Sequence, residues 1–362
     1  MPNPLPLRYG IIGTGLMGCE HIRNLAALPG AQVTALADPH ESSRNLGRRA
    51  CGEEAGGVDL YSDAREMIAC APIDAVVIAS PNHTHAEILE SVFDTDLHVL
   101  IEKPLCTTLA DCRHVASRAA RHAGVFWVGL EYRYMAPVSA FLHGLESGVV
   151  GSLKMLFIRE HRFPFLPKVG DWNRFNRNTG GTLVEKCCHF FDLMNLVMGC
   201  EPVRVLASGA QDVNHLEERY DGEVPDILDN AFVIVDYENG ARACLDLCMF
   251  AEGGRYEQEL VATGDAGKLE CTVPGSELVT STRRAGHWRS DPIAKDPRAL
   301  HTGFHHGASY LEHLDFMAAI RDRTPARVSA EDGLRSVVIG LAAHLSIEEG
   351  RAVDIQELDY KI

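Results

Sequence analysis

One glycine-rich turn constrains the fold of this chain more than any other feature. It lies between a short apolar run, Tyr9 to Ile12, and the start of a helical pattern. Its residues match the pattern G-x-G-x-x-G and are Gly13, Thr14, Gly15, Leu16, Met17 and Gly18. In a strand–turn–helix unit the first glycine permits the tight turn, the second lets a pyrophosphate approach the backbone, and the third lets the helix pack on the strand. We therefore expect a dinucleotide-binding α/β domain.

An acidic residue at the right distance strengthens this expectation. Asp38 ends the second β-branched run, 20 residues after Gly18. A carboxylate at this point accepts hydrogen bonds from the adenosine ribose and repels a 2′-phosphate. The spacing thus favours NAD over NADP, although Arg44 could moderate this preference. The alternative is that three glycines and an aspartate only shape turns.

The first 129 residues show the alternation of a doubly wound parallel sheet. Short β-branched runs alternate with stretches long enough for crossover helices. The predicted strands are Tyr9 to Ile12, Gln32 to Ala37, Ala75 to Ala79, His98 to Ile101 and Val125 to Val128. We expect residues 1–129 to form a Rossmann domain.

Beyond Gly129 the pattern changes to longer strands and tight turns. The predicted strands are Leu153 to Arg162, Val203 to Ser208, Ala231 to Tyr237, Ala241 to Met249 and Tyr256 to Ala262, with Asn239-Gly240 as a hairpin turn. Two helices follow, His306 to Asp322 and Ala330 to Glu349. We expect residues 130–362 to form an α+β domain with a large, mostly antiparallel open sheet, and the last helix to pack near the domain junction. The acidic stretch from Asp212 to Asp229 is expected to be a surface loop or, alternatively, a functional lid.

Composition narrows the possible partners. The chain has 34 Lys plus Arg and 50 Asp plus Glu, a net charge of −16, and no basic run, which argues against nucleic acid and against an anionic membrane surface. No apolar stretch approaches the length of a spanning helix, and the 11 scattered cysteines suit reduced thiols, so we expect a cytoplasmic protein. The only close histidine groupings, His83 with His85 and His305 with His306, lack zinc-site spacing, so no metal is expected.

Two further segments follow predicted strands and carry a family resemblance. They are Ser80-Pro81-Asn82-His83-Thr84-His85 and Glu102-Lys103-Pro104-Leu105. Together with the glycine turn they resemble the glucose–fructose oxidoreductase, inositol dehydrogenase and rhizopine-catabolism (Gfo/Idh/MocA) family over essentially the whole chain. The resemblance implies that Lys103 lies beside the nicotinamide and the substrate hydroxyl and is catalytic. From the residues alone, Lys103 could equally pair with a phosphate or a carboxylate.

The segment from Gly180 to Asp192 resembles a second family signature, G-G-x-x-x-D-x-G-x-H-x-x-D. On one continuous helix Thr182, Glu185, His189 and Asp192 fall within about 80° of one another, and the rest of the surface is mostly apolar. Buried ionisable groups on one face are costly unless they are paired or used. We expect His189 to be the catalytic base and Glu185 to orient it. The family usually has Asp where this chain has Glu185, and Gly where it has Cys187, and Lys186 adds a charge. The alternative is a satisfied core histidine with capping carboxylates.

The loop before this signature gathers positive charge. Trp172 lies in a loop that in the family reaches the nicotinamide and substrate. The nearby cations are Arg159, Arg162, Lys168, Arg174, Arg177 and Lys186, together with His161. They favour an anionic ligand such as a sugar acid, although they could instead pair with neighbouring acids and cofactor phosphates.

From these patterns we assign expected contacts. Besides the glycine turn and Asp38, cofactor contacts are expected from Ser80, Asn82, His85, Glu102, Lys103 and Trp172. Substrate contacts are expected from Tyr132, His161, Arg174, Arg177, Lys186 and Asp192.

Three functions compete. The leading one is an NAD-dependent oxidoreductase of a sugar, polyol or anionic sugar derivative, in which Lys103 and His189 handle the hydroxyl proton. The second is an NAD-dependent glycosidase that oxidises C3 transiently, eliminates the aglycone, adds water and restores the sugar, on an acidic glycoside such as a sulfosugar. The third is a catalytically silent dinucleotide sensor, against which Lys103 and His189 argue. The family resemblance implies a homodimer or homotetramer.

Overall fold

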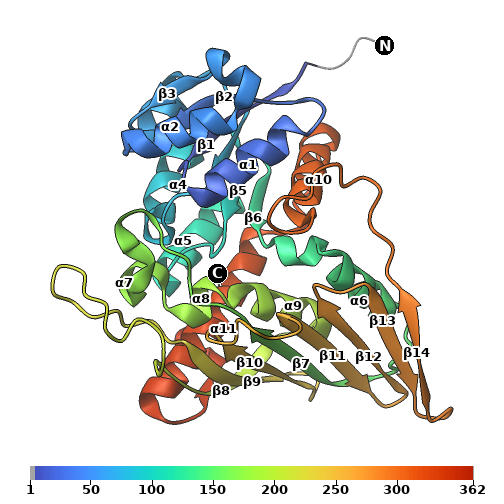
Figure 1. Ribbon diagram of the computed structural model, residues 1–362. Helices are drawn as coiled ribbons and strands as arrows, with labels where there is room; N and C mark the ends of the chain where they lie inside the picture. The colour runs from blue at the N-terminus through green and yellow to red at the C-terminus, as the bar shows by residue number, and fades with distance from the viewer. Residues whose placement is uncertain (1–4, 362) are drawn as a thin grey trace.

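The computed structural model describes residues 5–361 and contains two sheets, each covered by helices (Figure 1). The first sheet has six parallel strands in the order β3-β2-β1-β4-β5-β6. Its strands are β1 (Leu7–Ile12), β2 (Ala31–Ala37), β3 (Asp59–Tyr61), β4 (Ala75–Ile78), β5 (His98–Glu102) and β6 (Phe126–Gly129). The connecting helices are α1 (Leu16–Ala26), α2 (Glu41–Ala50), α3 (Ala64–Cys70), α4 (His85–Phe93) and α5 (Leu109–Ala119). This confirms the predicted Rossmann sheet.

The strand order places the predicted dinucleotide site. The chain runs outward from β1 through β2 to β3 and then returns to the other side of β1 with β4. Ligands bind at such a switch point, outside the carboxyl ends of the strands. The glycine turn follows β1 there, and Lys103 follows β5. Strand β3 was not predicted because it is a three-residue edge strand without an apolar run.

The second sheet has nine strands in the order β14-β13-β12-β11-β7-β10-β9-β8-β15. They are β7 (Leu153–His161), β8 (Pro202–Ala210), β9 (Asn230–Tyr237), β10 (Arg242–Cys248), β11 (Gln258–Gly264), β12 (Gly267–Val273), β13 (Glu277–Thr282), β14 (His287–Pro292) and β15 (Val353–Asp354). Only β7 and β10 pair in parallel, so the sheet is mostly antiparallel, as predicted.

Helices cover one face of this second sheet (Figure 1). They include α6 (Ala136–Glu146), α9 (Cys188–Met198) and α11 (Ala330–Glu349), whereas α10 (Ala308–Asp322) packs on α1 of the first domain. On β9, Val233 and Val235 are fully buried, whereas Phe232 is 62% exposed and Ile234 is 41% exposed. The other face of the sheet is therefore open in the single chain. Helix α11 packs on α9 and β8 and also on α5 and β6, so it joins the two sheets. None of the helices within residues 5–361 is long and apolar enough to cross a membrane.

The predicted continuous helix through the second signature is wrong. The structure divides it into α8 (Thr182–Glu185) and α9, with Lys186 and Cys187 forming the turn between them. In an unbroken helix the carbonyl of Glu185 would accept a hydrogen bond from the N–H of His189. Here Lys103 Nζ donates to that carbonyl at 3.0 Å. The break therefore supplies a backbone acceptor to the lysine that follows β5.

Candidate functional site

The three glycines of the turn have three different surroundings. Gly13 has a φ of 84°, and a Cβ added there would lie 2.7 Å from the carbonyl of Ala79. A Cβ on Gly18 would lie 1.9 Å from the carbonyl oxygen of Gly13, so only glycine lets α1 pack at this distance. A Cβ on Gly15 would meet no atom within 4 Å. The backbone at Gly15 is therefore open to a ligand, next to the N-terminus of α1, where free N–H groups attract phosphate.

Asp38 lies against this turn at the end of β2. Its Oδ2 accepts a hydrogen bond from the backbone N–H of Thr14 at 2.9 Å, and its Oδ1 accepts one from the backbone N–H of His40 at 2.9 Å. Arg44 Nη1 donates to the carbonyl oxygens of Asp38 and Pro39 at 2.6 and 3.1 Å. The carboxylate is thus fixed beside the open backbone. These residues fit the pyrophosphate and ribose of a dinucleotide.

The segment after β4 contributes Asn82 to the site. Asn82 Nδ2 donates to Glu185 Oε2 at 3.0 Å and thereby joins the first domain to α8. Ser80 Oγ accepts a hydrogen bond from Thr84 Oγ1 at 2.8 Å. The ring of Trp172 packs edge-on against His83, with ring centroids 6.3 Å apart. The loop that carries Trp172 therefore lies against this segment.

His85 does not have the role expected from the sequence. The residue is fully buried, with Nδ1 3.0 Å from the carbonyl of Pro104 and Nε2 3.2 Å from the carbonyl of Ser80. Both ring nitrogens therefore face backbone, and none is left for the cofactor. This corrects the expected cofactor contact: His85 connects the segments that follow β4 and β5.

Lys103 is held at the junction of the two domains and carries its charge. Burial alone would lower the pKa of Lys103, but the nearby thiol of Cys188 and the carboxylates of Glu185 and Glu102 raise it. The ammonium group is therefore a hydrogen-bond donor and not a base. Glu102, the residue before it, is buried, and its Oε1 lies 2.8 Å from His21 Nε2. Burial opposes ionisation of Glu102, yet the contact with His21 lowers its pKa to about 2.

His189 is the buried base candidate. It is 3% exposed, and its ring stacks on Tyr132 with centroids 4.1 Å apart. Burial, followed by the charges of Lys103 and Lys186, lowers its pKa well below the ordinary value. The imidazole is therefore neutral and able to accept a proton. Its Nδ1 is buried and has no hydrogen-bond partner among the described residues.

The carboxylate that faces His189 is not the predicted one. Glu131 Oε1 lies 3.7 Å from His189 Nε2, whereas Glu185 is bound to Asn82. This corrects the expectation that Glu185 orients His189. The reason is the break between α8 and α9, which removes the one-turn spacing of Glu185 and His189. Burial raises the pKa of Glu185, and the nearby positive charges of Lys103 and Lys168 oppose this rise.

Several predicted substrate residues have protein partners instead. Lys186 is 5% exposed, and its Nζ lies 2.9 Å from Glu160 Oε1 and donates to the hydroxyl of Tyr132 at 2.7 Å. Asp192 forms a bidentate ion pair with Arg133, whose Nε and Nη2 donate to its two carboxylate oxygens at 2.7 and 2.5 Å. Asp192 is therefore committed to the domain junction, which corrects its expected substrate contact. Tyr132 is retained in the site by its stacking on His189.

The positive loop is largely neutralised by acids. Arg174 Nε lies 3.1 Å from Glu218, Arg177 Nη2 lies 2.5 Å from Glu223, and His161 Nε2 lies 3.0 Å from Asp246. Glu218 and Glu223 belong to the acidic stretch 212–229, so that stretch is packed against the Trp172 loop. Arg174, Arg177 and His161 thus already have partners, but these partners are distant acids and not the neighbouring acids of the alternative interpretation. Lys168 is different, because its side chain has no ion pair or hydrogen bond within residues 5–361, although its carbonyl accepts a hydrogen bond from the N–H of Asp171.

The sequence interpretation did not assign roles to Glu131 and His305. Glu131 directly precedes Tyr132, for which a substrate contact was expected, and His305 was considered only as a metal ligand. The two residues approach each other at 3.6 Å in the structure. Only the packing of the loop before α10 against the start of the second domain brings them together, and no local pattern signals this contact.

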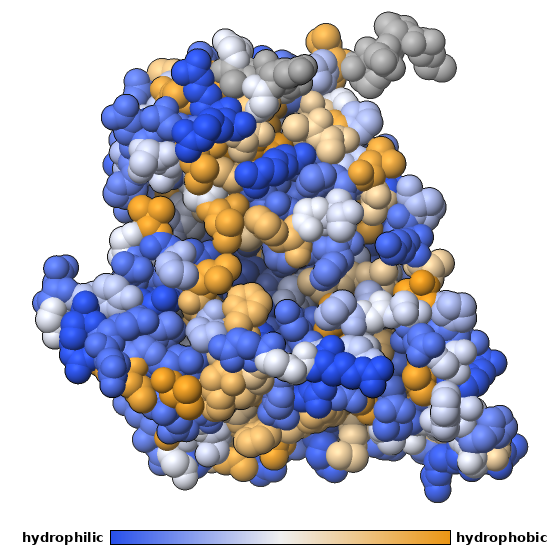
Figure 2. All heavy atoms as spheres, in the orientation of Figure 1, coloured by the Kyte–Doolittle hydropathy of each residue, from blue (hydrophilic) through white to orange (hydrophobic). Residues whose placement is uncertain are grey.

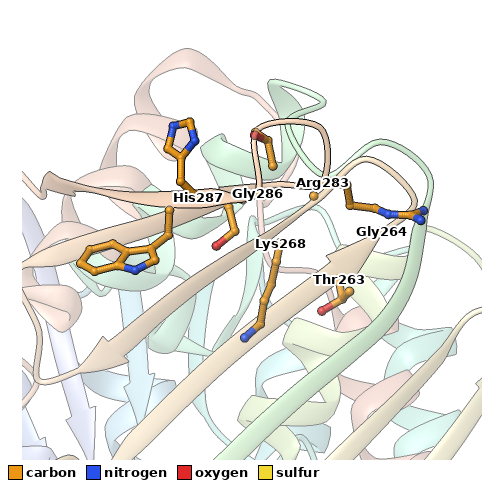
Figure 3. Close-up of a pocket in the computed structure, with 10 residues that line it drawn as sticks. Thr263, Gly264, Lys268, Arg283, Gly286 and His287 are labelled. Carbon is orange, nitrogen blue, oxygen red and sulfur yellow. The ribbon is translucent and has the colours of Figure 1, made fainter.

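The surface agrees with a site between the domains. In Figure 2 the face shown is hollowed between the Rossmann domain and the sheet domain. A separate depression, shown in Figure 3, lies among β11, β12, β13 and β14 and is lined by Lys268, Arg283, Trp288 and their neighbours. It contains none of the residues of the glycine turn or of the Lys103 and His189 cluster.

Comparison with known proteins agrees with this geometry. Residues 7–130 match the family model described as the oxidoreductase family, NAD-binding Rossmann fold, and residues 144–355 match the model of the C-terminal alpha/beta domain of the same family. The chain belongs to the Gfo/Idh/MocA oxidoreductase family. This confirms the resemblance, the fold class and NAD as cofactor, and it makes the chain an NAD-binding oxidoreductase of the inositol and sugar dehydrogenase type.

Named relatives of the chain act on polyols and sugars. The present chain is 28% identical to myo-inositol 2-dehydrogenase of Thermotoga maritima, over 97% of this chain and 99% of that one. The structure of scyllo-inositol dehydrogenase from Lactobacillus casei with bound NAD(H) and scyllo-inositol is similar, with a TM-score of 0.77 and 24% identity over 97% of this chain and 99% of that one. A levoglucosan dehydrogenase in complex with NADH and levoglucosan has a TM-score of 0.85 at 23% identity, over 97% and 99% of the two chains.

Proposed function

We propose that this chain catalyses the NAD-dependent oxidation of a secondary hydroxyl of a sugar or polyol. One observation carries the proposal: a charged lysine and a neutral, buried histidine lie together where the two domains meet, and the lysine follows β5 at the same edge of the first sheet as the glycine turn. Lys103 provides a hydrogen-bond donor and His189 provides a proton acceptor. Removal of a hydride from a carbinol requires both, because the hydroxyl loses a proton as the carbonyl forms.

The residues divide the work as follows. Bound NAD supplies the hydride acceptor. His189 Nδ1, which has no hydrogen-bond partner within residues 5–361, takes the hydroxyl proton. Lys103 Nζ donates a hydrogen bond to the same oxygen and stabilises the developing alkoxide. The carbonyl of Glu185 and the amide of Asn82 hold Lys103 and α8 in place, so Glu185 supports the lysine and not the histidine.

The substrate class follows from Lys168, the cation of the Trp172 loop whose side chain has no ion pair or hydrogen bond within the described residues. Lys168 lies near Lys103 and Glu185, and burial lowers its pKa. Arg162 lies close by, with a single 3.4 Å contact to Glu160 and a buried Nε that has no partner in the described part of the chain. We propose that Lys168 and Arg162, in place of Arg174 and Arg177, bind a carboxylate or sulfonate of an anionic sugar. Lys168→Met should then raise KM for anionic sugars and leave KM for neutral ones unchanged.

One assay tests this proposal against its alternatives. The chain is incubated with NAD or NADP and a panel of neutral sugars, sugar acids and aryl glycosides, and NADH and released aglycone are read in the same wells. A dehydrogenase forms NADH in step with product and prefers NAD. Release of aglycone without accumulation of NADH would instead establish the glycosidase. Binding of NAD with neither reaction across the panel would establish the sensor.

The open face of the second sheet supports a homodimer or homotetramer. Phe232, Ile234 and Leu206 are exposed on this face at 62, 41 and 47%. Contiguous apolar side chains of this kind mark interaction surfaces. Light scattering after size exclusion should give a multiple of the 39.7 kDa chain mass. Phe232→Lys should reduce that mass to a single chain.

A further inference from the structure

Three ionisable side chains from distant parts of the sequence converge behind the predicted base. Glu131 Oε1 lies 3.7 Å from His189 Nε2 and 3.6 Å from His305 Nε2. His305 Nδ1 lies 2.9 Å from Ser309 Oγ, at the start of α10. The imidazoles of His189 and His305 therefore meet on one carboxyl oxygen.

Exposure increases along this series. His189 is 3% exposed and Glu131 is 4% exposed, whereas the side chain of His305 is 23% exposed. A proton that reaches His189 has no direct route to solvent, because Nδ1 of His189 is buried and the ring stacks on Tyr132. His305 is the first member of the series that water can reach.

We propose that His189, Glu131 and His305 form a proton relay that carries the substrate hydroxyl proton from the site to solvent. The proposal rests on the proposed function, because it assigns the onward path of the proton that His189 accepts. Glu131 and His305 do not touch the substrate in this account. They are positioning residues that act through His189.

The proton passes from the substrate to water in four transfers. The hydroxyl O–H bond breaks as His189 Nδ1–H forms, and the electron pair of the C–H bond leaves as hydride to bound NAD. His189 Nε2–H then breaks as the proton passes to the ionised Oε1 of Glu131. Glu131 passes it to His305 Nε2, and His305 Nδ1–H releases a proton to water. Each gap of 3.6 to 3.7 Å must close by several tenths of an ångström during transfer.

The charges around the relay set its pH dependence. Burial, followed by the charge of Glu102, raises the pKa of Glu131 to about 8. Burial lowers the pKa of His305 to about 4. The other charged or titratable groups that face the three residues are Glu20, His21, Lys103, Arg162, Lys186 and Glu312. Because Glu131 must be ionised to accept the proton, sugar oxidation should rise with pH through about 8, and the reverse reduction should fall through the same range.

The test compares Glu131→Gln and His305→Gln with two controls. Glu312→Gln removes another buried carboxyl, which is 1% exposed, accepts a hydrogen bond from Trp127 and lies near Glu131. Burial raises the pKa of Glu312 well above its ordinary value, so this carboxyl is neutral and its replacement by an amide leaves the charge beside Glu131 unchanged. His306→Asn changes the exposed neighbour of His305 and suits its φ of 55°. The relay predicts that kcat falls by roughly 10- to 100-fold in Glu131→Gln, less than the ~10²–10⁴ of a direct acid–base group, with KM and NAD affinity unchanged.

Two readouts separate a relay from a structural role. In Glu131→Gln the rise of kcat near pH 8 should disappear, and in His305→Gln imidazole buffer should restore turnover. Both controls should keep the wild-type profile. An unchanged pH profile in Glu131→Gln, or a His305→Gln variant with full activity in any buffer, would overturn the relay.

A spectroscopic arm keeps the test valid if no sugar is oxidised. In that case the proposed function fails, and the relay is tested by infrared titration of the chain with NAD bound. The carboxylic acid band of Glu131 should vanish near pH 8 in the wild type and in Glu312→Gln, and it should be missing from Glu131→Gln. If the three spectra agree, Glu131 holds no transferable proton and the relay is refuted independently of catalysis.

Discussion

Replacing Lys186 by methionine distinguishes a buried ion pair from a substrate ligand. Lys186 is 5% exposed and Glu160 is fully buried, with 2.9 Å between Nζ and Oε1. Removing one member of a buried pair costs about 3–5 kcal/mol, because the other charge stays buried without a partner. Arg162 remains 3.4 Å from the same oxygen, so we take the lower end, about 3 kcal/mol. This corresponds to a loss of roughly 150-fold in the folding equilibrium constant.

Urea unfolding monitored by tryptophan fluorescence measures this loss. Lys186→Met should lower the midpoint without changing the slope, since the surface exposed on unfolding is the same. Replacing Glu160 by Met as well should recover most of the stability, with a coupling of about 2 kcal/mol or more between the two sites. A Lys186→Met variant that unfolds at the wild-type midpoint but has a raised KM would refute the ion-pair account and support the original prediction of a substrate contact.

Three further predictions follow from the dinucleotide site and from His305. Gly15→Ala should fold normally, since its Cβ meets no protein atom within 4 Å, and should lose NAD affinity by roughly tenfold or more in a calorimetric titration. Gly18→Ala should in addition unfold at a lower temperature, because its Cβ would lie 1.9 Å from the carbonyl oxygen of Gly13. Asp38→Ala should weaken NAD binding and improve the ratio of NADP to NAD turnover; an unchanged ratio would contradict its ribose role. His305 has a folded pKa of about 4 against about 6.5 when unfolded, so the free energy of unfolding should fall by up to about 3 kcal/mol as the pH drops from 6.5 to 4; His305→Gln should flatten that decline.

The parts of the site that could be predicted are those set by local geometry. Gly13, Gly15 and Gly18 act within one turn, and their spacing alone determines what they permit. Asp38 could be placed because parallel strands bring the end of β2 beside the end of β1. The same rule placed Lys103 at the end of β5.

The predictions that failed depend on contacts between distant segments. Glu185 and His189 share a face only if the helix continues, and the helix is broken at Lys186 and Cys187, where Lys103 binds the carbonyl of Glu185. The cations of the Trp172 loop looked unpaired because their acids, Glu218 and Glu223, lie more than 40 positions away. Glu131 and His305 were missed for the same reason. Tertiary packing decides which charges are neutralised, and local sequence patterns do not indicate which distant segments pack together.

Two of the strands that were not predicted have a physical explanation, whereas β12 was missed although its residues alternate as those of β11 do. Strands β13 and β14 form the exposed edge of the second sheet, and β14 has no buried residue. β14 therefore needs no alternating apolar pattern, and β13, which packs on α6, has Thr280 as its one buried residue, so its pattern is weak. Alternation identified β9 and β10, where one face packs on the helices.

The most direct test of the account is the rate of NADH formation in Lys103→Met and His189→Ala, measured with a substrate identified from the panel and together with the affinity for NAD. Both variants should bind NAD about as tightly as the wild type, because neither residue contacts the glycine turn. Turnover should fall by about 100-fold or more in each, the size expected for loss of an acid–base or oxyanion-stabilising group. Near-normal turnover in both variants would contradict the assignment of proton transfer to these two residues.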